Sequence, residues 1–170
     1  MKIWLILAIL IVIVAVVYFI IFILMRRRKY HPTKHQKRQA ELAGAIAREM
    51  NLSKKLVKML LMFGILHGTG SVEWPYPVAR TALQYHERLN GAGYPQKLAG
   101  DDILLEARIL AVADTVETMS SPRPNRPEMG LTKALEELKR TSSILYDSEV
   151  FKALVRLVEL GKFKFQTLYN

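Results

Sequence analysis

The sequence predicts an all-α protein, with one N-terminal membrane-spanning helix followed by a compact helical bundle. An uncharged run from Ile3 to Met25 is rich in Ile, Leu and Val. The rest of the chain repeats apolar residues at three- and four-residue spacing, the pattern of amphipathic helices, and the glycine-rich loop 90–100 lacks strand-like alternation. We therefore divide the chain into an anchor with a basic cluster, residues 1–29, and a helical domain, residues 30–170.

The run Ile3–Met25 is long enough to cross a bilayer as a helix. At about 1.5 Å per residue it spans roughly 34 Å, which exceeds a hydrocarbon core of about 30 Å. A cleaved signal peptide is the alternative, but its apolar region is only about 7–15 residues long and ends at a small-residue cleavage site. Here Met25 is followed directly by Arg26-Arg27-Arg28-Lys29. We expect an uncleaved anchor.

Basic residues predict the orientation of this anchor. Lys2 is the one basic side chain before the apolar run, whereas Arg26–Lys29, Lys34, Lys37 and Arg38 follow it closely. The positive-inside rule then places the amino terminus outside and the domain in the cytoplasm. The cluster Arg26–Lys29 is also expected to contact anionic lipid headgroups. The absence of cysteine fits a reducing compartment.

The formal charge of +10 does not indicate a nucleic-acid-binding protein. Residues 1–38 contain eight Lys or Arg and no acidic residue, so residues 39–170 contain 17 basic and 15 acidic side chains. The basic excess is therefore juxtamembrane, and the domain has no basic groove with interleaved aromatic residues. We expect no nucleic-acid partner.

Apolar spacing and capping residues predict the helices of the domain. Ser53 is the expected N-cap of the second helix, and either Asp147 or Ser148 is the expected cap of the last. Pro122, Pro124 and Pro127 keep the loop before the last two helices open. The predicted helices cover residues 34–50, 53–66, 78–88, 103–119, 132–140 and 148–160.

The segment most informative about chemistry is His86-Glu-Arg-Leu-Asn-Gly-Ala-Gly-Tyr-Pro95, which precedes Leu105-Glu-Ala-Arg-Ile-Leu-Ala-Val-Ala-Asp114. A potential metal ligand is followed by a two-glycine loop, a Tyr-Pro pair and a helix that carries a carboxylate. A single histidine on a helix is more often a surface or core residue than a ligand. Two further segments raise the expectation of a metal site, His35-Gln-Lys-Arg38 and Leu66-His67-Gly68.

Together these segments resemble the HD-GYP family, metal-dependent phosphodiesterases of bacterial cyclic dinucleotide signalling. His35 matches the first-helix histidine of this family, and His67 matches the histidine of its Leu-His-Asp segment. His86 matches its His-His-Glu segment, and Asp114 its Val-Ala-Asp segment. The resemblance implies an HD-type helical domain at the bacterial inner membrane, with His35, His67, His86 and Asp114 as ligands of a divalent iron or manganese ion.

The resemblance also implies a substrate-binding surface for a cyclic dinucleotide. Gly91, Gly93 and Tyr94 would shape the loop on the substrate side. Arg123 and Arg126 lie in a segment similar to the Arg-Pro-Tyr-Arg of the family and would face phosphate groups. Ordinary solvation of a loop is the alternative for the two arginines.

Departures from the family pattern predict impaired catalysis. The sequence has Gly68 where the family has the Asp of its His-Asp pair, Ser71 where it has a Lys, and Tyr85 where it has the first His of His-His-Glu. Nine residues separate Pro75 from Tyr85, where the family has further helices that carry another ligand. One alternative is a non-catalytic module that uses the Gly-Tyr-Pro loop to bind a signalling protein or a cyclic dinucleotide. The other is a relic without a dedicated role.

Overall fold

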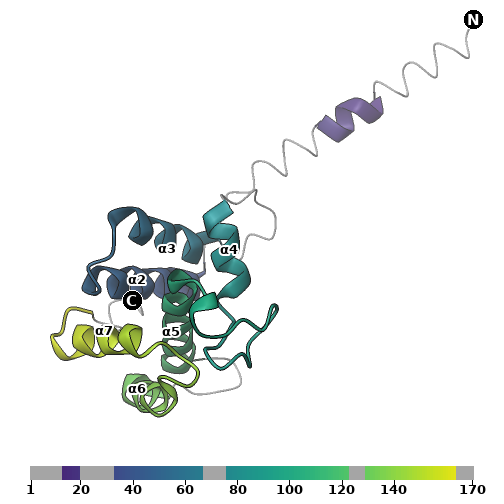
Figure 1. Cartoon of the computed structure of the whole chain (residues 1–170). Helices are drawn as coiled ribbons and strands as arrows, with labels where there is room; N and C mark the ends of the chain where they lie inside the picture. Colours follow the sequence, from purple (N-terminus) through teal and green to yellow (C-terminus); the bar gives the residue numbers. More distant parts are fainter. Residues whose placement is uncertain (1–12, 20–32, 67–75, 123–128, 164–170) are drawn as a thin grey trace, which may run out of the picture. The chain divides into compact units, whose positions relative to one another are not determined.

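The protein is represented by a computed structural model that describes residues 13–19, 33–66, 76–122 and 129–163 (Figure 1). The chain divides into two units, residues 1–31 and 32–170. The described residues contain helices and no strand, apart from an isolated bridge between Ser142 and Tyr146. The elements of the second unit are α2 (Lys34–Glu49), α3 (Lys54–Leu66), α4 (Tyr76–Gln84), the short 3₁₀ helix η1 (Gly100–Asp102), α5 (Leu105–Ser120), α6 (Gly130–Thr141) and α7 (Ser148–Glu159).

The predicted anchor lies largely outside the described residues. Of the run Ile3–Met25, residues 13–19 are described, and they are helical. No helix in the described part of the chain has the length and apolar character needed to cross a membrane. The membrane span stays a prediction.

Helix α2 is the central element of the helical unit, because it packs against α3, α5 and α7 (Figure 1). Its start is fixed by a capping box. The Thr33 hydroxyl accepts the Gln36 N–H, and the Gln36 side chain accepts the Thr33 N–H. The helix can pack on three sides because its segment 40–47 consists almost entirely of small and apolar residues, of which Leu42, Ala43, Ile46 and Ala47 are almost fully buried.

The core is formed by apolar side chains of α2, α3, α5, α6 and α7. Burial of such side chains is the main favourable term in folding, at about 25 cal/mol per Å² of apolar surface. These side chains form one cluster, which confirms the prediction of an all-helical domain for the described residues. Its largest fully buried apolar side chains are Leu42, Ile46, Leu60, Phe63, Ile103, Ile109, Leu110, Leu138 and Leu154.

The predicted caps are confirmed, and one alternative is decided. The Ser53 hydroxyl accepts the Leu56 N–H at the start of α3. At the start of α7, Asp147 and not Ser148 is the N-cap, since its carboxylate accepts the N–H groups of Glu149 and Val150.

The predicted limits of the helix 78–88 were wrong. Helix α4 begins at Tyr76, because Pro77 is tolerated in a first turn, and ends at Gln84. The Gln84 side chain accepts the Leu104 N–H, and Glu87 is buried, so the chain turns away from the helical path at this point. Tyr85 and His86 therefore lie in a turn and not on a helix. Helix α5 begins at Leu105, after η1, and not at Ile103.

The contact between α2 and α3 depends on a glycine. A Cβ atom added at Gly64 would lie 2.2 Å from Ala40 Cβ and 2.6 Å from Ala40 Cα, so Gly64→Ala would force the helices apart. We expect a loss of about 1–3 kcal/mol in the free energy of unfolding, as for other overpacked cores. Chemical denaturation followed by circular dichroism measures this loss.

Gly44→Ala is the matched control in α2. There an added Cβ would meet the movable Leu61 side chain at 3.0 Å, and the better helix propensity of Ala contributes about 1 kcal/mol in the opposite direction. Equal stability of the two variants would contradict the close approach at Gly64.

Candidate functional site

Two of the predicted metal ligands meet between α2 and α5. His35 lies in the first turn of α2, and Asp114 lies in the middle of α5. His35 Nε2 is 3.6 Å from Asp114 Oδ1. Both side chains are partly exposed, at 34% and 25%, so a group arriving from solvent can reach them.

Glu117 holds His35 in place. Its carboxylate contacts His35 Nδ1, Arg38 and the Ser121 hydroxyl, and its side chain is only 1% exposed. Burial would raise the pKa of Glu117, but the hydrogen bonds with His35, Ser121 and Arg38 together hold the pKa of this carboxyl below its ordinary value. A carboxylate on Nδ1 leaves Nε2 as the ring nitrogen that faces Asp114.

This arrangement meets part of the requirement for a metal site. A carboxylate that orients the far nitrogen of a ligating histidine is the usual outer partner in such sites. The parts of the chain that the structure describes contain no group of three His, Cys, Asp or Glu side chains arranged to hold a metal ion. The described residues thus bring two of the predicted ligands, His35 and Asp114, close together, and these two do not make a metal site by themselves.

Tyr85 occupies the position where the family has a histidine. Its ring meets the ring of Phe63 edge-on, with 5.2 Å between centroids, and it packs against the core. Burial, then the charges of Asp114 and Tyr94, raises the pKa of Tyr85 to about 12. The phenol is protonated at neutral pH and does not offer the lone pair of a neutral imidazole.

His86 is part of a stack of aromatic rings. Its ring lies 3.8 Å from the Tyr85 centroid and 4.7 Å from the Tyr94 centroid, and the rings of His86 and Tyr94 are nearly parallel at 24°. Tyr94 is 60% exposed, so the outer end of the stack faces solvent. The structure therefore places His86 between the loop and Tyr85.

The Gly-Tyr-Pro loop is held by Glu87. This side chain is 2% exposed, and its Oε1 atom accepts the Gln96 N–H at 2.6 Å. Gly93 lies so close to Glu87 that an added Cβ would be 2.3 Å from its Cα. Gly91 has a φ of 76°, in the left-handed region that glycine adopts at little cost. The two glycines thus allow the shape of the loop, and Glu87 fixes its position; a substrate-binding role of the loop stays a prediction.

Three of the predicted site residues, His67, Arg123 and Arg126, lie outside the described residues. The sequence did not predict the structural roles of two buried carboxylates, Glu117 and Glu87. A signal for Glu117 was present, because it follows Asp114 by three residues on a helix, as Arg38 follows His35. For Glu87 no local sequence signal distinguishes a buried carboxylate that bonds to the loop backbone from a carboxylate on the surface.

Replacing Glu117 with Gln is expected to lower stability near neutral pH and to weaken the loss of stability in acid. The folded-state pKa of Glu117 lies below its ordinary value of 4.5, so its stabilisation is complete above that pH and is lost as the pH falls further. Removing one partner of a buried ion pair costs about 3–5 kcal/mol, and the retained amide acceptor keeps the loss near the lower limit. Urea denaturation across a series of pH values measures both effects.

Glu41→Gln is the control, since Glu41 is an exposed carboxylate on α2. Its acid profile should match that of the unmodified chain. A Glu117→Gln profile as steep as that of the unmodified chain would mean that another carboxylate governs the acid transition.

Comparison with known proteins supports the resemblance. Residues 76–150 match a protein-family model described as HD domain. This region includes the Tyr85–His86 turn, the Gly-Tyr-Pro loop and Asp114, and it begins after His35.

Similar curated proteins are phosphodiesterases. The chain is 28% identical to a 3'3'-cGAMP-specific phosphodiesterase of Vibrio cholerae, over 72% of this chain and 37% of that protein. It is 30% identical to a cyclic di-GMP phosphodiesterase response regulator of Xanthomonas campestris, over 70% of this chain and 41% of that protein. It is 28% identical to a cyclic di-GMP phosphodiesterase of Thermotoga maritima, over 73% and 44%.

The chain spans less than half of the length of each of these relatives. The match to the Vibrio protein runs over 158 aligned residues but covers only 72% of the 170-residue chain, so the relative has residues within the matched region that this chain lacks. The short interval between Pro75 and Tyr85 predicts such a gap. The matches show similarity to an HD domain and to cyclic dinucleotide phosphodiesterases.

Proposed function

We propose that this chain is a membrane-anchored HD-GYP-type domain of the cyclic di-GMP phosphodiesterase family whose catalysis is impaired. The observation that carries the proposal is the approach of His35 to Asp114, with Glu117 fixing the ring of His35. His35 and Asp114 lie on α2 and α5, which are far apart in the sequence, and the fold brings them together. Metal-assisted hydrolysis of a phosphodiester is the ancestral reaction.

Impairment follows from what the site lacks. Tyr85 supports the core and stacks on His86, and it supplies no imidazole. In the sequence, Gly68 cannot coordinate a metal ion and Ser71 carries no charge to balance a phosphate group. We expect any metal ion to be iron or manganese, held weakly by His35, His67, His86 and Asp114.

The second candidate function is a non-catalytic binding module. Tyr94 is exposed while the loop beneath it is fixed by Glu87, so the loop presents a rigid aromatic surface without need of a metal ion. Such a surface suits a base of a cyclic dinucleotide or a side chain of a signalling protein. Binding of cyclic di-GMP that Tyr94→Ala weakens, without turnover, would favour this function over the first.

The anchor and the localisation are part of the proposal. The domain would lie on the cytoplasmic side of the bacterial inner membrane, with Arg26–Lys29 against anionic headgroups. The relatives from Vibrio, Xanthomonas and Thermotoga support a bacterial setting.

A carboxyl-terminal fusion tests the topology. We expect green fluorescent protein at this end to fluoresce and alkaline phosphatase to be inactive, because the basic residues follow the apolar run. Neutralising Arg26–Lys29 with Asn and adding basic residues before Ile3 should reverse both readouts. Active phosphatase on the unmodified chain, or cleavage near Met25, would contradict the anchor.

The full-length chain is expected to hydrolyse cyclic di-GMP at a rate near that of its Asp114→Ala variant, with manganese or iron supplied. Without a metal ion, the attacking water keeps its bulk pKa of about 15.7 instead of about 7.

Metal content per chain, measured by mass spectrometry of the purified protein, should fall in both His67→Ala and Asp114→Ala.

Partial restoration serves as the control for this expectation. Gly68→Asp with Ser71→Lys should recover little activity, because position 85 still lacks an imidazole. Robust metal-dependent turnover by the unmodified chain, abolished in His67→Ala, would show that a site with few ligands suffices. Equal metal content in all chains would show that His67 and Asp114 are not ligands.

A further inference from the structure

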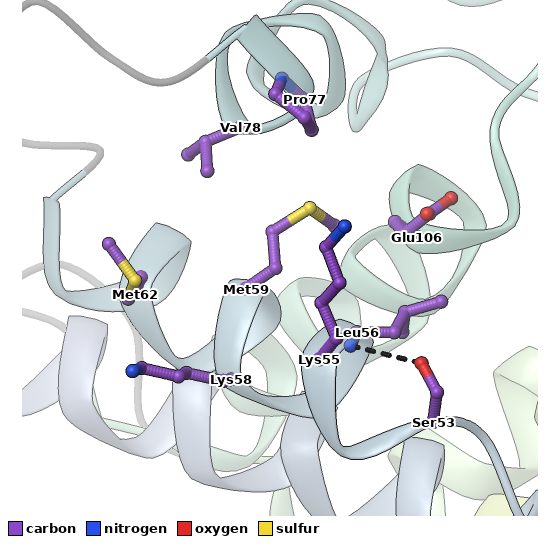
Figure 2. Close-up of a pocket in the computed structure, with 9 residues that line it drawn as sticks. All are labelled: Ser53, Lys55, Leu56, Lys58, Met59, Met62, Pro77, Val78 and Glu106. Carbon is purple, nitrogen blue, oxygen red and sulfur yellow. Dashed lines mark hydrogen bonds between the residues drawn. The ribbon is translucent and has the colours of Figure 1, made fainter.

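An apolar groove lies between α3 and α4, and none of the predicted site residues lines it. Figure 2 shows Met59 of α3 extending toward Pro77 and Val78 of α4, with Met62 on the same helix beside it. The groove has a volume of about 460 Å³, and Val78, on its α4 side, is buried. This volume is enough for two or three apolar side chains of a ligand.

Lysines of α3 flank one side of this groove. Lys55 and Lys58 line it, both are exposed, and Figure 2 shows their side chains extending along and away from the apolar floor. Lys54 precedes them on the same helix. In the described part of the chain no ion pair joins any of the three lysines to a carboxylate, and Glu106 is the single acidic residue of the lining. The rim therefore has an excess of positive charge.

A small polar ligand does not fit this lining. Pockets for such ligands have a few polar groups that converge on the ligand and fix its orientation. Here the hydroxyl of Ser53 already accepts the Leu56 N–H, as the dashed line in Figure 2 shows. A flat bilayer does not fit either, since the apolar residues line a groove between helices and Val78 among them is buried.

We propose that this groove binds an amphipathic helix of a partner protein, with its apolar face between α3 and α4 and its acidic residues paired with Lys55 and Lys58. Insertion of an apolar helix face into a hydrophobic groove is a recurrent mode of peptide recognition. Methionine side chains such as Met59 and Met62 are flexible and polarizable, so they adapt to the side chains that enter. The lysines select acidic helices over basic ones.

A second copy of the chain is disfavoured as the occupant. A symmetric contact at this groove would place the same lysines of two copies opposite one another, and like charges repel. The acidic partner removes this repulsion and supplies the counter-charges that the rim lacks.

The test uses the full-length chain in phosphatidylcholine nanodiscs and three labelled synthetic peptides. The first is a designed helix with Leu on one face and Glu on the other, the second has Lys in place of Glu, and the third is a scrambled form of the first without an apolar face. Fluorescence anisotropy should show binding of the first peptide alone. Binding should weaken as salt is raised, because exposed charges are screened over about 10 Å at 0.1 M.

Paired charge reversals locate the contact. Lys55→Glu with Lys58→Glu should weaken binding by about tenfold or more, as expected when complementary charges become repulsive. Lys133→Glu with Lys139→Glu, two exposed lysines on α6, changes the net charge equally and should leave binding within about twofold. Met62→Ser removes apolar lining from a half-buried residue and should also weaken binding.

Other outcomes would overturn the proposal. Equal binding of the scrambled peptide would mean simple charge attraction. Binding to phosphatidylglycerol vesicles that depends on Lys55 and Lys58, with none to the helix, would identify a lipid surface. Self-association in analytical ultracentrifugation that the same two substitutions abolish would identify a second copy.

Discussion

The buried carboxylate of Glu117 is the constraint that links the fold to the candidate site. An ionised group that is 1% exposed is tolerated only when hydrogen bonds and opposite charges surround it. Arg38, itself 9% exposed, supplies the charge, and Ser121 and His35 supply further contacts. Because Arg38 and His35 belong to α2 while Glu117 belongs to α5, this cluster fixes the register of the two helices. The same register brings His35 to Asp114.

The helices could be predicted from the sequence because each has its own local signals. Amphipathic spacing and the caps Ser53 and Asp147 act within one turn of the chain, and the structure confirms them. The end of α4 could not be predicted in this way. It depends on Gln84 bonding to Leu104 and on the burial of Glu87 beneath the loop, and both contacts join residues that are distant in sequence or separated by an irregular segment.

The candidate site shows a similar division. His35 and Asp114 were predicted as ligands through the resemblance of short segments, and the fold brings these two side chains together. The role of Glu117 depends on α2 and α5 meeting, which no local pattern reveals. Tyr85 has a structural role that no metal-site pattern predicts, since its ring packs against Phe63 and the core.

Helix α3 contributes to the groove and to the packing of Tyr85. Met59 and Met62 line the groove, whereas the buried Phe63 contacts the ring of Tyr85. The charge of Asp114 in turn contributes to the raised pKa of Tyr85. Coupling between two such surfaces requires an element with two arrangements of similar free energy. The close approach of Gly64 to Ala40 opposes sliding of α3 along α2, since a shift would bring larger side chains into that contact. A partner in the groove would therefore be held on a rigid helix, which favours docking over switching.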